Sequence, residues 1–474
     1  MTDNHAPRDA VILGLRGLIG DAHVLDRDDE MSPYLTDWRK RFTGSALCVV
    51  RPGSTADVSS IVQYAAQHGL AIVPQGGNTG LVGGSVPLGR GDEIILSLAR
   101  LNTIREVDPR SDVMVVEAGV TLAAVQQAAE TADRLFPLSL ASEGTATIGG
   151  VIGTNAGGTA VLAYGNMRDL VLGLEVVLAD GRIWNGLGKL RKDNTGYDLR
   201  NLFIGSEGTL GIVTAAVVKL FPAPKSRATC VCGLASPDDA LAFLQIAKAA
   251  AGASLTTFEL MPRLGIDLVL KHVPNTRDPI FEEHAWYVLL EFSSQSTYGA
   301  DAMAQAVMME AVDKAYVEDG VFAVSLAQRD DFWRLRESLP EAQTREGYSV
   351  KHDISVPLDC LADLIVAVSA EAKRMVAGIR PLPFGHMGDG NLHFNFQSPE
   401  GTDGSDLKAH AADLHAMVYR HVLAMKGSIS AEHGIGQVKR AQLAATKDPV
   451  ALDLMRTLKV ALDPDGRLNP GKVI

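Results

Sequence analysis

The stretch PQGGNTGLVGG, residues 74–84, follows a short apolar run, Leu70 to Val73, that we expect to form a buried strand. Its five glycines free the backbone to make a tight turn whose N–H groups can point at one anion, and a pyrophosphate suits such a turn. The spacing is not G-x-G-x-x-G, and no helical pattern opens directly after it. The stretch therefore does not predict a Rossmann dinucleotide fold, and an ordinary turn between strands is the alternative interpretation.

A second glycine-rich segment, EGTATIGGVIGTNAGG at residues 143–158, favours a cofactor over an ordinary turn. Its six glycines and small polar residues expose backbone that could follow an extended molecule rather than a single phosphate. The alternative is a small-residue packing surface between two sheets.

The sequence around these segments predicts alternating helices and strands. Ser54 and Thr55 can cap a helix that Gly69 ends, and Asp180-Gly181 between two apolar runs indicates a hairpin. An apolar strand over residues 215–221 is followed by Pro222 and Pro224, which mark a domain boundary.

After that boundary the pattern predicts a sheet covered by helices. Ser236-Pro237 has the order of a capped helix start, and residues 255–260 and 286–292 have the composition of strands. A helix over residues 300–316 follows.

Length and composition limit the class of protein. A chain of 474 residues that is 46% hydrophobic and 21% charged is typical of a globular enzyme of two or three domains. The net charge of −12 gives no electrostatic reason to bind nucleic acid or anionic lipid. The first 20 residues lack the basic start of a signal peptide, and no apolar run reaches the ~20 residues of a membrane span. The four cysteines form no C-x-x-C pair, so a reducing cytoplasm is the expected location.

Two histidines flank a glycine-rich turn in GHMGDGNLH, residues 385–393. The turn can fold His386 back toward His393, and a borderline metal accepts such neutral imidazole nitrogens. The strand that follows alternates, with Leu392 among the apolar positions and His393 and Asn395 among the polar ones.

A third metal ligand is expected from SAEHGIG, where Glu432 and His433 precede Gly434. Two imidazoles and one carboxylate leave a coordination position open, which is the pattern of a catalytic metal, and Zn²⁺ or Mn²⁺ would fit. The alternative is that these are ordinary loop and core histidines.

Five strings together resemble the flavin-binding family typified by vanillyl-alcohol oxidase and p-cresol methylhydroxylase. They are PQGGNTGLVGG, TIGGVIGTNAGG, YGNMRDLVLGLEVVLADG, TGYDLRNLFIGSEGTLGIV and LDPDGRLNPGK. Within that family the histidine segments resemble D-2-hydroxyacid dehydrogenases of the D-2-hydroxyglutarate type. The resemblance implies an α+β fold, with a two-subdomain FAD-binding domain and an α/β cap domain. The expected domain organisation is an N-terminal helical segment over residues 1–42, the FAD domain over 43–222, the cap over 223–427 and a return to the FAD domain over 428–474.

The resemblance also implies which residues bind FAD. They are Pro74, Gly76, Gly77, Asn78, Thr79, Gly80, Pro137, Gly144, Thr145, Gly149, Gly153, Thr154, Ile212 and Asn469. Related proteins that attach FAD covalently use a His or Cys, and the first loop offers only Asn78 and Thr79, so noncovalent FAD is expected.

By the same resemblance, His386, His393 and Glu432 are the metal ligands, Asn395 contacts a substrate carboxylate, and His433 is the proton acceptor. A D-2-hydroxyacid, with D-2-hydroxyglutarate favoured and D-lactate as the alternative, would lose a hydride to flavin N5. Electrons would leave to an electron-transfer flavoprotein or a quinone, and a homodimer is the expected assembly.

The second carboxylate of such a substrate is expected to bind Arg336 and Lys351. Proline stands at position 340, where the resembling enzymes use Thr, and this departure removes a hydrogen bond worth about 1 kcal/mol. A surface ion pair is the alternative role for either cation. A metallohydrolase and a flavin-binding protein without turnover are the competing function classes.

Overall fold

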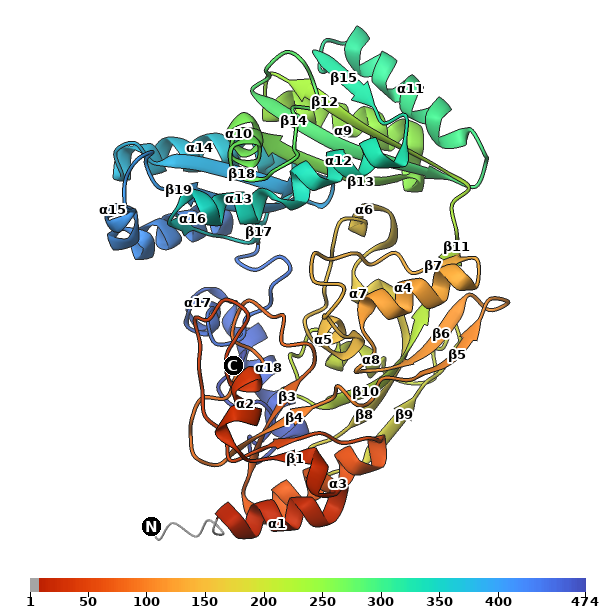
Figure 1. Ribbon diagram of the computed structural model, residues 1–474, viewed down its shortest axis with the longest axis vertical. Helices are drawn as coiled ribbons and strands as arrows, with labels where there is room; N and C mark the ends of the chain where they lie inside the picture. Colours follow the sequence, from red (N-terminus) through yellow and green to blue (C-terminus); the bar gives the residue numbers. More distant parts are fainter. Residues whose placement is uncertain (1–7) are drawn as a thin grey trace. The chain divides into compact units, whose positions relative to one another are not determined.

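Four crossings of the chain divide the structure into two folding units, each described separately below (Figure 1). A computed structural model describes residues 8–474. Within that range, unit 1 comprises the residues up to Gly158, Gly165–Ala223 and Glu432–Ile474, and unit 2 comprises Thr159–Tyr164 and Pro224–Ala431. Six residues in the middle of the unit 1 sequence thus belong to unit 2.

The first sheet of unit 1 has four strands in the order β1-β2-β4-β3. They are β1 (Val24–Leu25), β2 (Val49–Val50), β3 (Ala71–Gln75) and β4 (Glu93–Ser97). Helices α1 (Arg8–Ile19) and α3 (Thr55–His68) pack on one face through buried aliphatic side chains such as Leu15, Ile61 and Ile72. The expected caps of α3 are confirmed, because the Ser54 side chain accepts from the N–H of Asp57 and Gly69 ends the helix at φ 66°.

The second sheet of unit 1 is antiparallel, with the order β5-β6-β10-β8-β9. Its strands are β5 (Ile104–Asp108), β6 (Val113–Glu117), β8 (Val171–Val177), β9 (Ile183–Gly186) and β10 (Ile212–Lys219). The predicted hairpin at Asp180-Gly181 joins β8 to β9.

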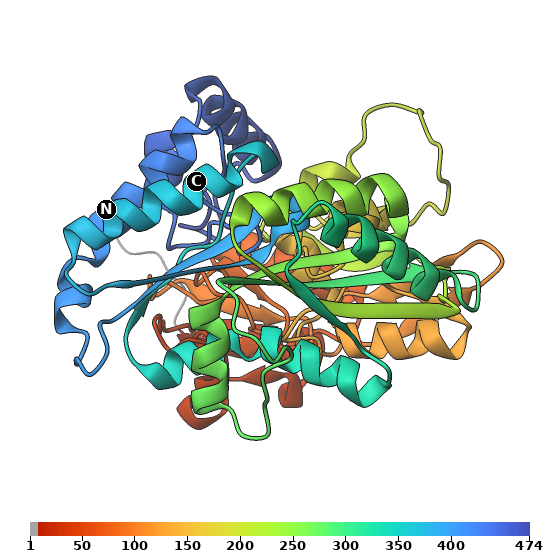
Figure 2. The same cartoon turned by 90° about the horizontal axis from the view of Figure 1, so that it is seen from above.

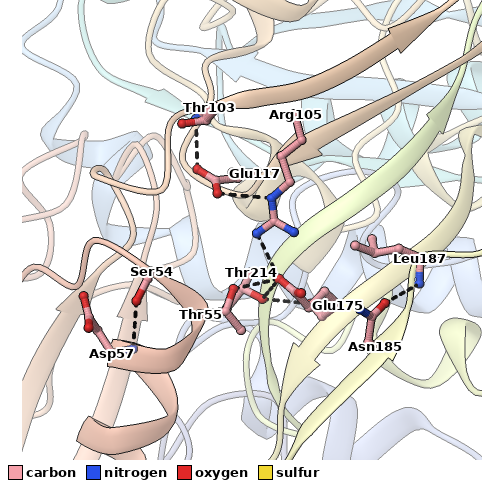
Figure 3. A network of polar contacts seen from close by, with 10 residues as sticks. All are labelled: Ser54, Thr55, Asp57, Thr103, Arg105, Glu117, Glu175, Asn185, Leu187 and Thr214. Atoms are coloured by element: carbon pink, nitrogen blue, oxygen red, sulfur yellow. Dashed lines mark hydrogen bonds and ion pairs between the residues drawn. The ribbon is translucent and has the colours of Figure 1, made fainter.

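One buried carboxylate ties this sheet to α3 (Figure 3). Glu175 of β8 accepts hydrogen bonds from Thr55 at 2.7 Å, Thr214 at 3.0 Å and Arg105 at 3.1 Å. Arg105 also pairs with Glu117 across β5 and β6 at 3.1 Å. Because all three donors of Glu175 come from different elements, the network fixes α3 against the sheet.

Unit 2 is built on an eight-stranded sheet, with β17 attached beside the path β15-β12-β14-β13-β18-β19-β16. Its strands are β12 (Ser226–Leu234), β13 (Leu255–Pro262), β14 (Trp286–Ser294), β15 (Asp319–Phe322), β16 (Ser349–Val350), β17 (Ile354–Ser355), β18 (Arg380–His386) and β19 (Asn391–Gln397). The strands predicted over residues 255–260 and 286–292 are therefore confirmed.

Helices cover both faces of this sheet. Helices α9 (Pro237–Ala251), α11 (Gly299–Asp313), α14 (Leu361–Met375) and α16 (Ala411–Ala424) bury their apolar sides on one face. Figure 2 shows α9 and α11 running side by side there. Helices α10 (Arg263–His272), α12 (Leu326–Glu337) and α13 (Leu339–Glu346) pack on the other face, around Phe384 and Tyr287.

The remaining elements are short or lie at the edges of the units. In unit 1 they are α2 (Asp28–Leu35), α4 (Leu122–Thr131), β7 (Arg134–Leu135), α5 (Ile148–Gly153), α7 (Met167–Leu170), α8 (Arg200–Phe203), β11 (Phe221–Pro222), α17 (Arg440–Thr446) and α18 (Pro449–Leu462). In unit 2 they are α6 (Val161–Tyr164) and α15 (Ser405–Ala409). Among residues 8–474, no helix combines the length and the apolar character needed to cross a bilayer.

Candidate active site

The two glycine-rich segments of unit 1 pack directly on each other. A Cβ on Gly77 would lie 1.9 Å from the carbonyl oxygen of Thr145, and a Cβ on Gly76 would lie 2.4 Å from Oγ1 of Thr147. There is no room for a side chain at either position, so the contact between the two segments requires glycine at both. The second segment thus forms a small-residue packing surface against the first loop, whereas the alternative interpretation placed such a surface between two sheets.

The outer side of the same loop leaves its backbone open to a ligand. Within residues 8–474, the N–H groups of residues 76–82 donate to no protein group. Gly80 and Gly144 have no heavy atom within 4 Å of the position that a Cβ would occupy. A row of unpaired N–H groups beside open space is what an anionic, extended group such as the pyrophosphate of FAD requires, so the residues fit this cofactor.

Other residues expected at the cofactor have structural partners of their own. The side chain of Asn78 donates to the carbonyl of Thr36 at 2.8 Å and accepts from Ser85 at 2.8 Å. The N–H of Gly149 donates to the carbonyl of Ala118 at 2.7 Å. Thr79 is half-buried on the first loop, Gly153 and Thr154 end α5, Pro74 lies on β3, Pro137 is buried after β7, and Ile212 begins β10.

Glu207 holds the loop that carries Glu432 and His433. Its carboxylate accepts from the N–H of Ile435 at 2.7 Å and from the N–H of Gly436 at 2.8 Å. Burial raises the pKa of Glu207, and the two N–H groups oppose that rise. The backbone is irregular here, with Gly434 at φ 81° and Gly436 at φ 49°.

Within unit 2, the turn between β18 and β19 brings two histidines together. The strands pair antiparallel with Phe384 opposite His393, and Gly390 takes the left-handed conformation at φ 83°. The rings of His386 and His393 lie 5.6 Å apart, and each offers a ligand nitrogen within 4.8 Å of the other. The donor chemistry of this pair therefore fits a borderline divalent metal.

The polar face of β19 is buried rather than solvated. Asn391 donates to Asp353 at 3.0 Å, and Asn395 donates to Gln343 at 2.9 Å. Asp353 also offers a carboxylate oxygen within 4.8 Å of a ligand nitrogen of His393. Asp353 was not among the site residues expected from the sequence, and its signal was the adjacent pair His352-Asp353 directly before the buried Ile354.

A buried glutamate links His386 to Arg336. Glu259 on β13 is 1% exposed, and its two oxygens lie 2.5 Å from Nδ1 of His386 and 2.6 Å from Nε of Arg336. Burial alone would raise the pKa of Glu259, but Arg336 and His386 outweigh it and hold the pKa at about 2. Glu259 was not among the expected site residues either, and its signal was a lone acidic residue in the apolar strand LTTFELMP.

The residues expected to bind a second carboxylate are arranged unequally. Arg336 is buried, its guanidinium carbon lies 5.1 Å over the ring of Phe384, and its Nη atoms make no hydrogen bond within the described chain. Lys351 is half-buried between β16 and β17. Pro340 is exposed in the first turn of α13, where a missing N–H costs nothing, so the helix start explains the proline.

Two family models match the chain. One, described as "FAD binding domain", covers residues 46–186, and the other, "FAD linked oxidases, C-terminal domain", covers residues 223–473. The mitochondrial D-2-hydroxyglutarate dehydrogenase of Bos taurus is 42% identical over 456 residues, which span 95% of this chain and 81% of that protein. The D-2-hydroxyglutarate dehydrogenase of Xanthomonas citri pv. viticola is 36% identical over 98% of this chain and 97% of its own.

Solved structures share the fold at low identity. p-Cresol methylhydroxylase with substrate bound superposes with a TM-score of 0.77 at 18% identity, over 100% of this chain and 98% of that one. Alkyldihydroxyacetonephosphate synthase gives 0.77 at 17% identity, over 99% and 87%. These similarities confirm the expected α+β fold of the vanillyl-alcohol oxidase and p-cresol methylhydroxylase type. The chain therefore belongs to the FAD-linked oxidase family of FAD-dependent oxidoreductases, in the group that contains the D-2-hydroxyglutarate dehydrogenases.

Proposed function

We propose that this protein is an FAD- and divalent-metal-dependent dehydrogenase that oxidises a D-2-hydroxyacid, D-2-hydroxyglutarate before D-lactate, to the 2-oxoacid. The observation that carries the proposal is the histidine pair of the β18–β19 turn, one member of which shares a carboxylate with the buried Arg336. A metal-binding pair and a substrate-binding cation fixed by the same group suit a substrate with carboxylates at both ends. The names of the relatives agree with that choice.

The cofactors would supply what side chains cannot. The flavin supplies the hydride acceptor at N5, and a divalent ion held by His386, His393 and Glu432 supplies a Lewis acid for the hydroxyl and carboxylate of the substrate. Glu432 follows unit 2 directly in the chain, and the N–H of Gly158 donates to its carboxylate at 3.3 Å.

The chain's own residues bind the substrate and move one proton. His433 takes the hydroxyl proton as general base while the hydrogen on the α-carbon leaves with two electrons. Asn395 keeps one N–H beyond its bond to Gln343, and this group is available to the nearer carboxylate. The unpaired Nη edge of Arg336, together with Lys351, binds the farther one in the forked geometry that guanidinium groups favour.

The test is anaerobic flavin reduction by a panel of hydroxyacids. We expect D-2-hydroxyglutarate to bleach the yellow protein, D-lactate to do so more slowly, and L-isomers to leave it oxidised. Chelation by EDTA should slow the bleaching, and acid precipitation should release the flavin because it is not covalently attached. Reduction by L-isomers alone, or unchanged reduction after EDTA, would contradict the proposal.

A variant pair separates the histidine site from general damage. His393→Ala should slow flavin reduction by at least about 100-fold, because a Lewis acid is worth several kcal/mol in such a reaction. His410→Ala is the matched control, since His410 lies in the same unit and its Nδ1 lies 2.9 Å from the backbone carbonyl of Asp406. Equal rates of flavin reduction in the two variants would contradict the proposed role of the metal.

The external acceptor is proposed to be an electron-transfer flavoprotein or a quinone, and the assembly a homodimer. The bovine relative is named as mitochondrial, and the cytoplasmic location expected from cysteine usage stays a prediction. The structure describes all four cysteines as free thiols.

A further inference from the structure

Three elements of unit 2 meet at the carboxylate of Glu259. The residue lies on β13 opposite His386 of β18 in the antiparallel ladder, so the two side chains stand on the same face. Arg336 reaches the carboxylate from α12, which packs on that face. Each oxygen of Glu259 serves one partner, at 2.5 Å for His386 and 2.6 Å for Arg336.

A buried charge in this position needs a reason. Ionised groups lose hydration when they are buried, and an apolar side chain of similar volume is often no less stable. Unit 2 contains a comparison, because Glu291 of β14 is also buried and binds Arg329, seven residues before Arg336 on α12, at 2.8 Å. Besides its arginine, Glu291 accepts hydrogen bonds from Thr229 and Trp333. Besides its arginine, Glu259 has the imidazole of His386 as its partner.

The contact with Glu259 determines which nitrogen of His386 carries the proton. An ionised carboxylate only accepts hydrogen bonds, so Nδ1 at 2.5 Å must be the donor. In a neutral ring this leaves the Nε2 lone pair as the ligand atom. A carboxylate behind a metal-binding imidazole also raises its basicity and fixes its orientation.

We propose that Glu259 is a positioning residue that holds His386 ready for the metal through Nε2 and, through its other oxygen, directs Arg336 toward the far carboxylate of the substrate. The inference rests on the proposed function. It adds that metal affinity and recognition of a dicarboxylate depend on one buried group. Losing that group affects both properties together.

Glu259→Gln tests the inference, because an amide has one acceptor oxygen for two donors. Metal-free protein is titrated with Zn²⁺ or Mn²⁺ against a chromophoric chelator. We expect Glu259→Gln to weaken metal binding by about 10- to 100-fold. At saturating metal, KM for D-2-hydroxyglutarate should rise more than KM for D-lactate, which has no second carboxylate.

Glu291→Gln is the matched control. It breaks a buried pair with the same helix, so it should lower stability while metal affinity and the ratio of the two KM values stay at wild-type levels. Equal metal affinity and an unchanged KM ratio in Glu259→Gln would overturn the positioning role and leave the proposed function intact. A wild-type protein that binds neither metal would overturn the metal site itself, and the positioning role with it.

A measurement on the wild-type protein covers the case in which Glu259→Gln does not fold. In protein labelled with ¹⁵N-histidine, the long-range ¹H–¹⁵N pattern of His386 should be that of the Nδ1–H form, with His386→Gln used for assignment. A pattern of the Nε2–H form would overturn the inference.

Discussion

At the scale of single residues, glycine is needed at position 77 because the neighbouring segment packs against it, and at position 80 because the open side of the loop must admit a ligand. A methyl group on Gly77 would meet the Thr145 carbonyl at 1.9 Å, whereas one on Gly80 would meet nothing within 4 Å. We therefore expect Gly77→Ala to lower the free energy of unfolding by about 3 kcal/mol, the upper range for overpacking. Urea unfolding, monitored by the rise in flavin fluorescence as FAD is released, measures this change.

Gly80→Ala is the control for that prediction. The metal-free and flavin-free protein should unfold at the wild-type urea concentration, while affinity for FAD falls because the added methyl group occupies the open side of the loop. If Gly80→Ala destabilised the flavin-free protein as much as Gly77→Ala, the distinction between the packed and the open side of the loop would be wrong.

Some site residues could be predicted from the sequence, and others could not. His386, His393 and the glycines of the first loop carry recognisable chemistry at recognisable spacing, so a single sequence indicates them. Glu259 lies 127 positions from His386, and only the pairing of β13 with β18 makes them neighbours. A lone glutamate in an apolar strand signals that some partner exists, but not which one.

At the scale of elements, Glu346 connects α13 to α10 and β18, and it makes stability depend on pH. Burial raises the pKa of Glu346, but hydrogen bonds from His272, Lys271 and Arg380 outweigh burial and lower it from 4.5 to about 2. A carboxylate whose pKa is lowered by folding makes its full contribution to stability at pH values above its pKa in the unfolded chain. That contribution is lost as the pH falls toward the folded-state pKa of about 2. We expect Glu346→Gln to cost about 2 kcal/mol at pH 7, the range for hydrogen bonds to charged groups.

The measurement is urea unfolding of both proteins between pH 7 and pH 3, followed by tryptophan fluorescence. The difference between wild type and Glu346→Gln should shrink as pH falls below about 4.5. Glu341→Gln is the control on the same helix, because its exposed pair with Arg345 should be worth less than about 1 kcal/mol. A constant difference at every pH would contradict this account.

Elements with strong local signals were predictable, and α5 was not. The caps at Ser54 and Gly69 and the turn at Gly390 act through neighbouring residues, so their sequence signal is local. Helix α5 reads IGGVIG, and each glycine costs about 1 kcal/mol relative to alanine in a helix. Packing of Gly149 against Ala118 and burial of Ile148 and Ile152 form this helix against its intrinsic preference.

At the scale of the whole molecule, residues 432–474 complete unit 1, and Asn469 fixes them there. Its N–H donates to the carbonyl of Ile72 at 2.8 Å, and its side chain donates to the carbonyls of Gly84 at 2.9 Å and Glu207 at 2.7 Å. We expect Asn469→Ala to cost about 3 kcal/mol, from two lost buried hydrogen bonds and the positive φ of 44°. Flavin content after purification and the urea midpoint for flavin release measure the loss.

Asn275→Ala is the matched control. Asn275 also has a positive φ, 59°, but it is exposed in unit 2, so the variant carries the backbone strain without the buried bonds. It should cost about 1 kcal/mol and leave flavin content unchanged. Equal flavin loss in the two variants would show that the contacts of Asn469 are not what closes unit 1.

The return of the chain to unit 1 was predictable from sequence, because LDPDGRLNPGK resembles a flavin-binding motif. The passage of Thr159–Tyr164 into unit 2 was not, since six residues carry no periodic pattern. These residues are held in unit 2 by individual contacts, such as the hydrogen bond that the hydroxyl of Thr257 donates to the carbonyl of Thr159 at 3.0 Å.

The order of these segments has a consequence for biosynthesis. A ribosome that makes this chain exposes all residues of unit 2 before residues 432–474 emerge, so the nascent polypeptide can finish unit 2 first although it began with unit 1. Until then the part of unit 1 that ends at Ala223 lacks the hydrogen bonds that Asn469 makes with the carbonyls of Ile72 and Gly84. We therefore expect the vitamin-derived cofactor to bind only after residues 432–474 have joined unit 1.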